Sequence, residues 1–387
     1  MTAVARRTPF LPALLALAFT VLALLPARAD GYRAETLAQG LDRPWALAFL
    51  PSSGDLVITG RGGALWLWQA ENGALQSLAG APEVDARGQG GLLDITPAPD
   101  FAETAQLYLA WSGADARGHT ATHLGRARLD RAGQALRDLE LLYVAEPFLN
   151  AQGHYGARIV VERDHVFLGL GDRQRKDFGP DHIAQDLSNA YGAVIRLGRD
   201  GSVPPDNPFA GQPGVEGAIW SYGHRNIQAM ARHPETGALW LAEHGESGGD
   251  EINIVERGGN YGWPLASFGV DYRSGRAFAP PHQPGDGFIA PVHHWPAGRA
   301  DNFPPSGMVF YDGEAFPNWR GHLLIGNLRH QYLGLFAIED GQVTQAARLL
   351  DGAGWRIRDV AVGPDDGFIY AIGDGPGAPL LRLVPAE

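Results

Sequence analysis

The sequence contains no cysteine and, among its 387 residues, a single lysine, Lys176. Without cysteine the chain forms no disulfide and has no C-x-x-C-H motif for covalent haem, so its stability must come from a hydrophobic core. Hydrophobic residues make up 45% of the chain, which is enough for a large core at this length. No low-complexity linker or block of charge divides the sequence into domains.

Long hydrophobic runs are also missing, apart from one near the N-terminus. Basic residues precede an apolar run from Phe10 to Leu25, and an A-x-A motif ends at Ala29. The run is shorter than the roughly 20 residues of a membrane span and has the layout of a secretory signal peptide. We therefore expect residues 1–29 to be removed on export to the periplasm or the medium. Residues 30–387 would form one domain without a membrane span.

Basic residues are scarce relative to acids. Without the first 29 residues, which hold three arginines and no acid, 28 basic residues stand against 43 acidic ones, a net charge of −15. A surface this acidic disfavours nucleic acid and anionic membranes as partners.

Helical periodicity is almost absent beyond the N-terminal segment, whereas short β-rich runs bounded by Gly, Pro, Asp and Asn recur. One unit, made of an apolar strand, a turn and a second strand ending in small or polar residues, returns about six times. The units are PWALAFLPSSGDLVITG, LLDITPAPDFAETAQLYLAWS, ARIVVERDHVFLGLGD, IQAMARHPETGALWLAEHG, SGMVFYDGEAFPNWRGHLLIGN and IRDVAVGPDDGFIYAIGDG.

These irregular repeats predict an all-β fold, a six-bladed β-propeller of radially arranged four-stranded sheets. A β-sandwich rarely exceeds about 250 residues as one domain, and solenoid repeats are shorter and more uniform. The ring closes if the first mature strand, near Tyr32 to Leu37, pairs with the last, near Leu380 to Leu383. Polar residues at strand ends would then gather at one end of the central channel, where we expect the functional site.

The candidate site residues all lie where repeats start or end. They are Gln89, His154, Asp172, Arg225, Asn226, the segment EHGESGGDEIN at 243–253, Arg329, Arg356 and Arg358.

Arg356 and Arg358 are two residues apart, so on a strand their side chains point to the same face. Two like charges side by side need an anion between them or water around them. One interpretation is a solvated edge strand. Because Arg225 and Arg329 occupy equivalent places on other blades, the other is a cluster that binds a multiply charged anion through guanidinium forks.

The segment from Glu243 to Asn253 is rich in glycine and acids, which supply the carboxylate and carbonyl oxygens that calcium prefers. Its spacing is not that of an EF-hand, so an ordinary acidic turn is the alternative. Tyr261 and Trp263 follow in GGNYGWP, and the ordinary role of such aromatics is packing between blades.

Thirteen histidines are present, so any one of them is more often structural than catalytic. His154, in GHYGARIV, opens the third repeat and would point toward the channel. The pair His293 and His294 lacks the spacing of a zinc site, and we interpret both as loop residues.

Several motifs resemble, in type and order, the soluble sugar dehydrogenases that depend on pyrroloquinoline quinone (PQQ), most closely the aldose sugar dehydrogenase branch. They are GQGGLLD, GHRN, EHG followed by GGDEIN, NYGWP and R-x-RDV, within a resemblance that runs from about residue 40 to 383. The resemblance implies a six-bladed propeller that binds PQQ and calcium and oxidises aldoses at the anomeric carbon to lactones. With no haem motif, electrons would pass to a separate acceptor.

The resemblance also implies roles for individual residues. His154 would be the catalytic base, Arg225 would assist catalysis, and Gln89 would lie near sugar and cofactor. Arg225 and Asn226 would contact the quinone oxygens, and Arg329, Arg356 and Arg358 would complete the cofactor site. Gly245 and Glu246 would offer backbone carbonyls to the calcium under PQQ, and Glu251 and Tyr261 resemble ligands of a second calcium.

Three positions depart from the family pattern. The family commonly has proline at Glu246, which would fix the turn, and lysine at Arg329. The glucose-specific branch commonly has aspartate where Gly153 precedes His154, which argues against tight glucose specificity. Two other functions stay open: a metal-dependent lactonase-type hydrolase, with carboxylate and asparagine side chains on the axis, and a non-catalytic binding propeller.

Overall fold

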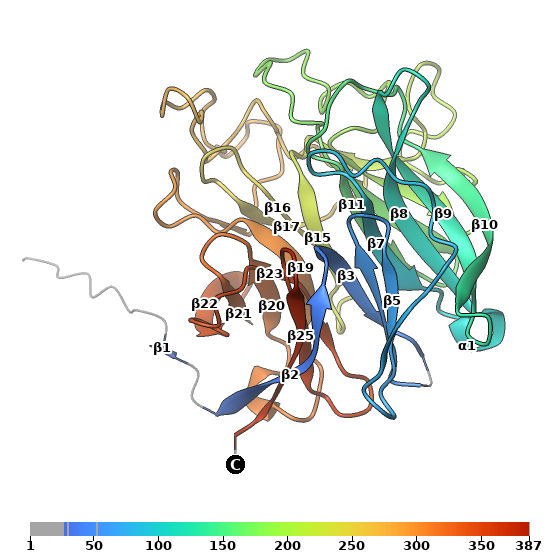
Figure 1. The fold of residues 1–387 in the computed structure, drawn as a ribbon. Coiled ribbons are helices and arrows are strands. Elements are labelled where there is room, and N and C mark those ends of the chain that lie inside the picture. Colours follow the sequence, from blue (N-terminus) through green and yellow to red (C-terminus); the bar gives the residue numbers. More distant parts are fainter. Residues whose placement is uncertain (1–26, 29–30, 52, 387) are drawn as a thin grey trace, which may run out of the picture.

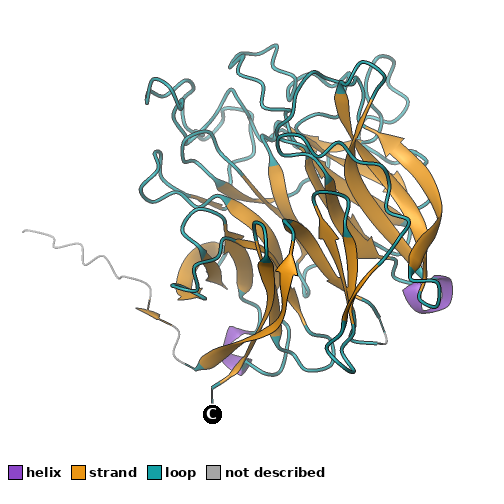
Figure 2. Ribbon diagram, viewed as in Figure 1, coloured by secondary structure: helices purple, strands orange, loops and turns teal. Residues whose placement is uncertain are grey.

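The computed structural model describes residues 27–28, 31–51 and 53–386. Strands and loops make up nearly all of this part of the chain, with one short α-helix, α1 (Phe101–Thr104), and one 3-10 turn, η1 (Pro317–Trp319) (Figure 2). No helix within the described ranges has the length and apolarity that crossing a membrane requires. Apart from Ala27 and Arg28, which form a short strand β1, the predicted signal peptide lies outside the described residues.

The strands form six sheets, the blades of a propeller. Blade 1 consists of β3 (Pro44–Phe49), β4 (Leu56–Gly60), β5 (Leu65–Trp68) and β6 (Leu75–Ser77). Blade 2 consists of β7 (Leu92–Pro97), β8 (Gln106–Ala114), β9 (Thr120–Asp130) and β10 (Ala135–Val144). Blade 3 consists of β11 (Gly156–Val161), β12 (His165–Leu170), β13 (Ala193–Gly198) and β14 (Ile219–Tyr222).

The second half of the ring repeats this order. Blade 4 consists of β15 (Ile227–Arg232), β16 (Leu239–Glu243), β17 (Glu251–Ile254) and β18 (His293–His294), so the two histidines expected in a loop form a short strand. Blade 5 consists of β19 (Pro305–Phe310), β20 (Leu323–Asn327), β21 (Tyr332–Glu339) and β22 (Gln342–Leu349), with β1 added in parallel to β22. Blade 6 consists of β23 (Ile357–Val362), β24 (Ile369–Gly373), β25 (Ala378–Pro385) and β2 (Tyr32–Leu41).

Blade 6 joins the two ends of the chain, as the sequence predicts. The N-terminal strand β2 pairs antiparallel with β25, with Ala34 opposite Leu383 and Thr36 opposite Leu381 (Figure 1). The innermost strands β3, β7, β11, β15, β19 and β23 contact one another in turn around the axis. The six predicted repeats are the first two strands of the six blades, and the predicted propeller is confirmed.

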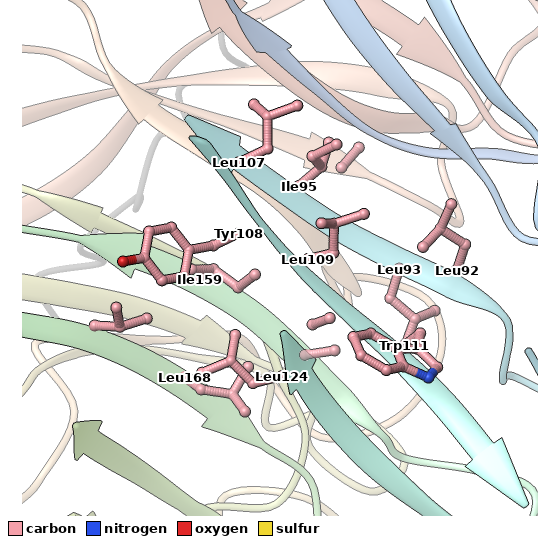
Figure 3. Packing of buried hydrophobic residues seen from close by; sticks show 14 of the residues in the cluster. Leu92, Leu93, Ile95, Leu107, Tyr108, Leu109, Trp111, Leu124, Ile159 and Leu168 are labelled. Carbon is pink, nitrogen blue, oxygen red and sulfur yellow. The ribbon is translucent and has the colours of Figure 1, made fainter. Parts of the chain in front are cut away.

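Apolar side chains between neighbouring blades form the core. Between blades 2 and 3, Tyr108 and Leu124 pack with Ile159 and Leu168 (Figure 3). The innermost strands are buried over their first four or more residues, and the second strands are almost entirely buried, since each blade covers the next. Such burial explains how the chain is stable without disulfides.

A buried ion network lies among the innermost strands. The Arg158 guanidinium lies 3.1 Å from Asp94 Oδ1 and 3.1 Å from Asp359 Oδ2, and it donates to the Gln228 carbonyl at 2.9 Å. It also stacks over the Trp45 ring at 4.4 Å. Side chains from four of the six innermost strands and a backbone carbonyl from a fifth therefore meet in one network, which fixes the blades relative to one another.

Candidate active site

Each innermost strand carries a register irregularity at its start, where β-bulges re-aim side chains. In four blades the residue inside the irregularity, Trp45, Leu93, Gln228 or Arg358, lines a cavity of about 310 Å³ on the propeller axis. All six blades contribute residues to its wall. The cavity lies where the innermost strands begin and the second strands end, the place where we expect the site.

The cavity wall is rich in arginine. Arg43, Arg61, Arg356 and Arg358 line it, and the one carboxylate among the described residues of the wall is Asp374. Asp374 Oδ2 lies 2.9 Å from Arg356 Nε and 3.1 Å from Arg358 Nη2. Burial by itself raises the pKa of Asp374, but the charges of Arg358 and Arg356 outweigh it and lower the pKa. One ionised carboxylate beside four guanidiniums leaves an excess of positive charge.

The guanidiniums of Arg356 and Arg358 lie together as predicted, but not because they share the face of a regular strand. Arg356 precedes β23 and its side chain is 48% exposed, whereas Arg358 sits in the irregularity and its side chain is 9% exposed. The bulge, rather than a regular strand face, brings both guanidiniums to Asp374. Arg358 is not on a solvated edge strand, and its buried Nε has no hydrogen-bond partner among the described residues.

His154 forms a buried pair with Asp172 next to this cavity. His154 Nδ1 lies 2.7 Å from Asp172 Oδ1, and both side chains are at most 5% exposed. Burial and then the charge of Arg225 lower the pKa of His154, so the imidazole is neutral near pH 7. Because an ionised carboxylate only accepts hydrogen bonds, Nδ1 carries the proton and Nε2 keeps a free lone pair. This is the tautomer that a general base needs.

Gln89 fixes the backbone of His154. The His154 amide donates to Gln89 Oε1 at 2.8 Å, and His154 has φ of 47°, in the left-handed region that few non-glycine residues adopt. Strain of this kind persists where surrounding contacts hold it, and it concentrates at functional sites. His154 itself is not part of the cavity wall, but Tyr155, Gly156 and Gln89 are.

Arg225 belongs to an ion network beside the dyad. Its Nη2 lies 2.6 Å from Glu246 Oε2, and Glu246, with a fully buried side chain, also pairs with Lys176. The sequence singled out Glu246 for its carbonyl, but its carboxylate is what holds Arg225 and ties the Lys176 loop to the loop after β16. The two ion pairs therefore tie down this turn, at the position where the resemblance implies proline.

Three of the four predicted metal ligands line one cleft. Gly245, Glu251 and Tyr261 line a narrow cleft of about 10 Å³ together with Glu243 and Arg225, while Glu246 does not line it. The Tyr261 phenol is committed to the Ile254 carbonyl and the Glu256 amide, so only its backbone carbonyl is left for a metal. A methyl group on Gly245 would lie about 2.3 Å from the Gly248 and Gly249 oxygens, so this loop requires glycine there.

The structure separates the remaining predicted residues. Gln89, Asn226, Arg356 and Arg358 line the axial cavity, Arg225 lines the neighbouring cleft, and Arg329 is exposed and outside both walls. Sequence reasoning missed Asp374 and named the cavity histidine His244 only within the segment 243–253. Burial lowers the pKa of His244 to about 3. Both follow a blade's second strand, as Asp172 does, so alignment of the repeats against one another would have found them.

The sequence matches the model of the glucose/sorbosone dehydrogenase family over residues 41–382. The chain belongs to this family. It is 41% identical over 355 residues to the aldose sugar dehydrogenase YliI of Escherichia coli, covering 91% of this chain and 92% of that protein. Family membership makes the chain an oxidoreductase that acts on sugars.

Solved structures agree with this assignment. The apo-form of the soluble aldose sugar dehydrogenase from Escherichia coli superposes with a TM-score of 0.83 at 39% identity, covering 92% of this chain and all of that one. The PQQ-bound aldose sugar dehydrogenase from Streptomyces coelicolor has a TM-score of 0.73 at 27% identity, covering 94% of this chain and all of that one.

Proposed function

We propose that this protein oxidises aldoses at the anomeric carbon to lactones, with PQQ and calcium as cofactors and a separate electron acceptor. The observation that carries the proposal is the arginine-rich axial cavity beside a neutral, buried histidine paired with a carboxylate. The arginine-rich cavity would accommodate a polyanion, and the histidine would remove a proton from the substrate. The PQQ-bound relative supports the choice of polyanion.

The cavity fits PQQ, which carries three carboxylates. Four arginines line the wall, and the buried Nε of Arg358 has no partner among the described residues. An unpaired buried donor is costly, and an anion that accepts from it removes that cost. Arg356 and Arg358 would hold carboxylates of the cofactor, and Asn226, with Arg225, would reach the quinone oxygens. Arg329, on the surface, would contact PQQ only at the rim.

The cleft beside Arg225 fits a cation. Glu251 is almost fully buried, and the described part of the chain places no cation within ion-pair distance of its carboxylate. Burial and then the negative charge of Glu243 raise its pKa well above the usual range. Buried Asn253 Oδ1 also lacks a donor among the described residues. Calcium in this cleft would be held by the Glu251 carboxylate and the Tyr261 carbonyl, and a second ion would use the Gly245 and Glu246 carbonyls.

The chain's own residues then divide the chemistry. PQQ, when bound, supplies an electrophilic quinone carbon that accepts a hydride from the sugar. His154 Nε2 takes the proton of the anomeric hydroxyl, and Asp172 stabilises the imidazolium that results. Arg225, held by Glu246, would stabilise negative charge on the quinone oxygen. Gln89 keeps His154 in its left-handed conformation and so keeps the base in place.

The axis argues against the hydrolase alternative. A lactonase-type site needs a metal held by axial carboxylates. Here Asp94 and Asp359 share the guanidinium of Arg158, and Asp374 pairs with Arg356 and Arg358. A binding propeller without chemistry needs no His154–Asp172 pair.

Reconstitution tests the proposal. Protein prepared without PQQ should reduce a redox dye with aldoses only after addition of both PQQ and calcium, and a titration followed by absorbance should show stoichiometric PQQ binding. Full activity after prolonged incubation with a strong calcium chelator would contradict the metal assignment. Dye reduction in the absence of PQQ, or no PQQ binding in the presence of calcium, would contradict the cofactor.

A further inference from the structure

Trp263, in the loop after β17, is 5% exposed and contacts the dyad from the side opposite His154. Its indole Nε1–H donates to Asp172 Oδ2 at 2.8 Å, while His154 Nδ1 lies 2.7 Å from the other oxygen, Oδ1. The three side chains form a continuous row. They come from the start of blade 3, the end of its second strand and a loop of blade 4.

The same indole also contacts Arg225. The guanidinium carbon lies 5.1 Å from the ring centroid, within the range of a cation–π interaction. Phe178 and Phe278, stacked on each other at 4.2 Å, meet the ring edge-on at 5.8 and 5.4 Å. These contacts restrict rotation of the ring, so the directions of its N–H and of its face are both set.

We propose that Trp263 is a positioning residue that sets the basicity of His154 through Asp172 and the orientation of Arg225 through its ring. This inference rests on the proposed function, in which His154 and Arg225 act on sugar and cofactor. It assigns a role to an aromatic residue that the sequence suggests only for packing between blades.

The physical argument concerns the charge of Asp172. A carboxylate that accepts a hydrogen bond at its second oxygen interacts less strongly with a cation at the first, so the indole N–H lowers the stability of protonated His154. The other charged groups facing His154 are Arg225 and Lys176, which lower its pKa, and neutral His244 lies nearby. His182, with Nε2 at 3.7 Å from Asp172 Oδ2, is too far away for a hydrogen bond to replace the indole.

The variant Trp263→Phe keeps a ring against Arg225 and removes the N–H. We expect the pKa of His154 to rise by about 0.5 to 1 unit, the shift that corresponds to one net hydrogen bond. The pKa is measured by NMR on cofactor-free protein with labelled histidine, and the signal is assigned by its loss in His154→Gln. The matched control is Trp240→Phe, which alters a tryptophan of similar burial, 4% exposed, that packs edge-on against Phe310 of blade 5.

Three outcomes decide the proposal. The proposal is supported if the pKa of His154 rises in Trp263→Phe and does not change in Trp240→Phe. It is overturned if the pKa of His154 is unchanged in Trp263→Phe or shifts equally in both variants. If Trp263→Phe does not fold, the parent protein gives the answer: the Trp263 indole proton signal should shift with the same midpoint as the His154 titration. An indole signal that stays constant through that titration overturns the proposal.

Kinetics separate this inference from the proposed function. In the loaded enzyme, the acidic limb of the profile of kcat/KM against pH should move up in Trp263→Phe by the same amount as the NMR pKa. If the loaded parent does not oxidise aldoses, the proposed function fails. The NMR result still decides whether Trp263 controls His154, because it needs neither cofactor nor sugar.

Discussion

Replacing Arg158 with methionine should leave two buried carboxylates facing each other without a cation. The side chains of Asp94 and Asp359 are 5% and 6% exposed at the propeller axis. Each carboxylate lies 3.1 Å from the same guanidinium nitrogen of Arg158. Methionine keeps much of the arginine stem's packing but supplies no charge. Breaking a buried ion pair from one side typically costs about 3–5 kcal/mol, and we expect a loss of that size at pH 8.

The loss should depend on pH in a defined direction. Even beside Arg158, burial raises the pKa of Asp94 to about 6, and burial also raises the pKa of Asp359. A carboxyl whose folded-state pKa exceeds its unfolded value stabilises the fold when protonated, and this contribution disappears as pH rises through the folded-state pKa. Without Arg158 both pKa values rise further, at about 1.4 kcal/mol per unit. The variant should therefore lose less stability at pH 5 than at pH 8.

Urea denaturation of both proteins at pH 5 and pH 8 measures these losses. The matched control is Arg196→Met, because Arg196 is also buried and stacked on a tryptophan, Trp220 at 4.8 Å, but its partner Asp206 has a 68% exposed side chain. The control should lose less stability and show little dependence on pH. A loss below about 1 kcal/mol in Arg158→Met, or equal losses at both pH values, would refute the reasoning.

Three further predictions concern the site. His154→Gln should lower turnover with saturating PQQ by at least about 10²-fold and leave PQQ affinity intact, and turnover within a few-fold of the parent would show that the proton goes elsewhere. Arg356→Ala and Arg358→Ala should weaken PQQ binding in a titration by about 1.5–3 kcal/mol, with the larger effect for buried Arg358; unchanged binding in both would remove the anion clamp. Glu246→Gln leaves Arg225 buried without its anion and should lower stability in thermal denaturation of cofactor-free protein by about 3 kcal/mol, whereas Lys176→Met, at a 42% exposed side chain, should cost less than about 1 kcal/mol. The reverse order of these two variants would contradict the ion network.

The sequence by itself determined the architecture, because its information is local and repeated. A hydrophobic strand followed by a turn and a second strand recurs in each blade, and this pattern alone predicted six sheets and the pairing of the N-terminal strand with the C-terminal ones. It also placed Gln89, Asn226, Arg356 and Arg358 at strand ends, and these residues line the axial cavity.

The tertiary structure decided which side chains pair, because those pairs join residues far apart in the chain. The bulge at the start of β23, not the strand period, turns Arg358 toward Asp374. The Glu246 side chain reaches Arg225 and Lys176 through a fold that no local pattern encodes. Asp172 meets Trp263 across 91 residues, because the ring of blades brings loops from two different sheets together beside one channel.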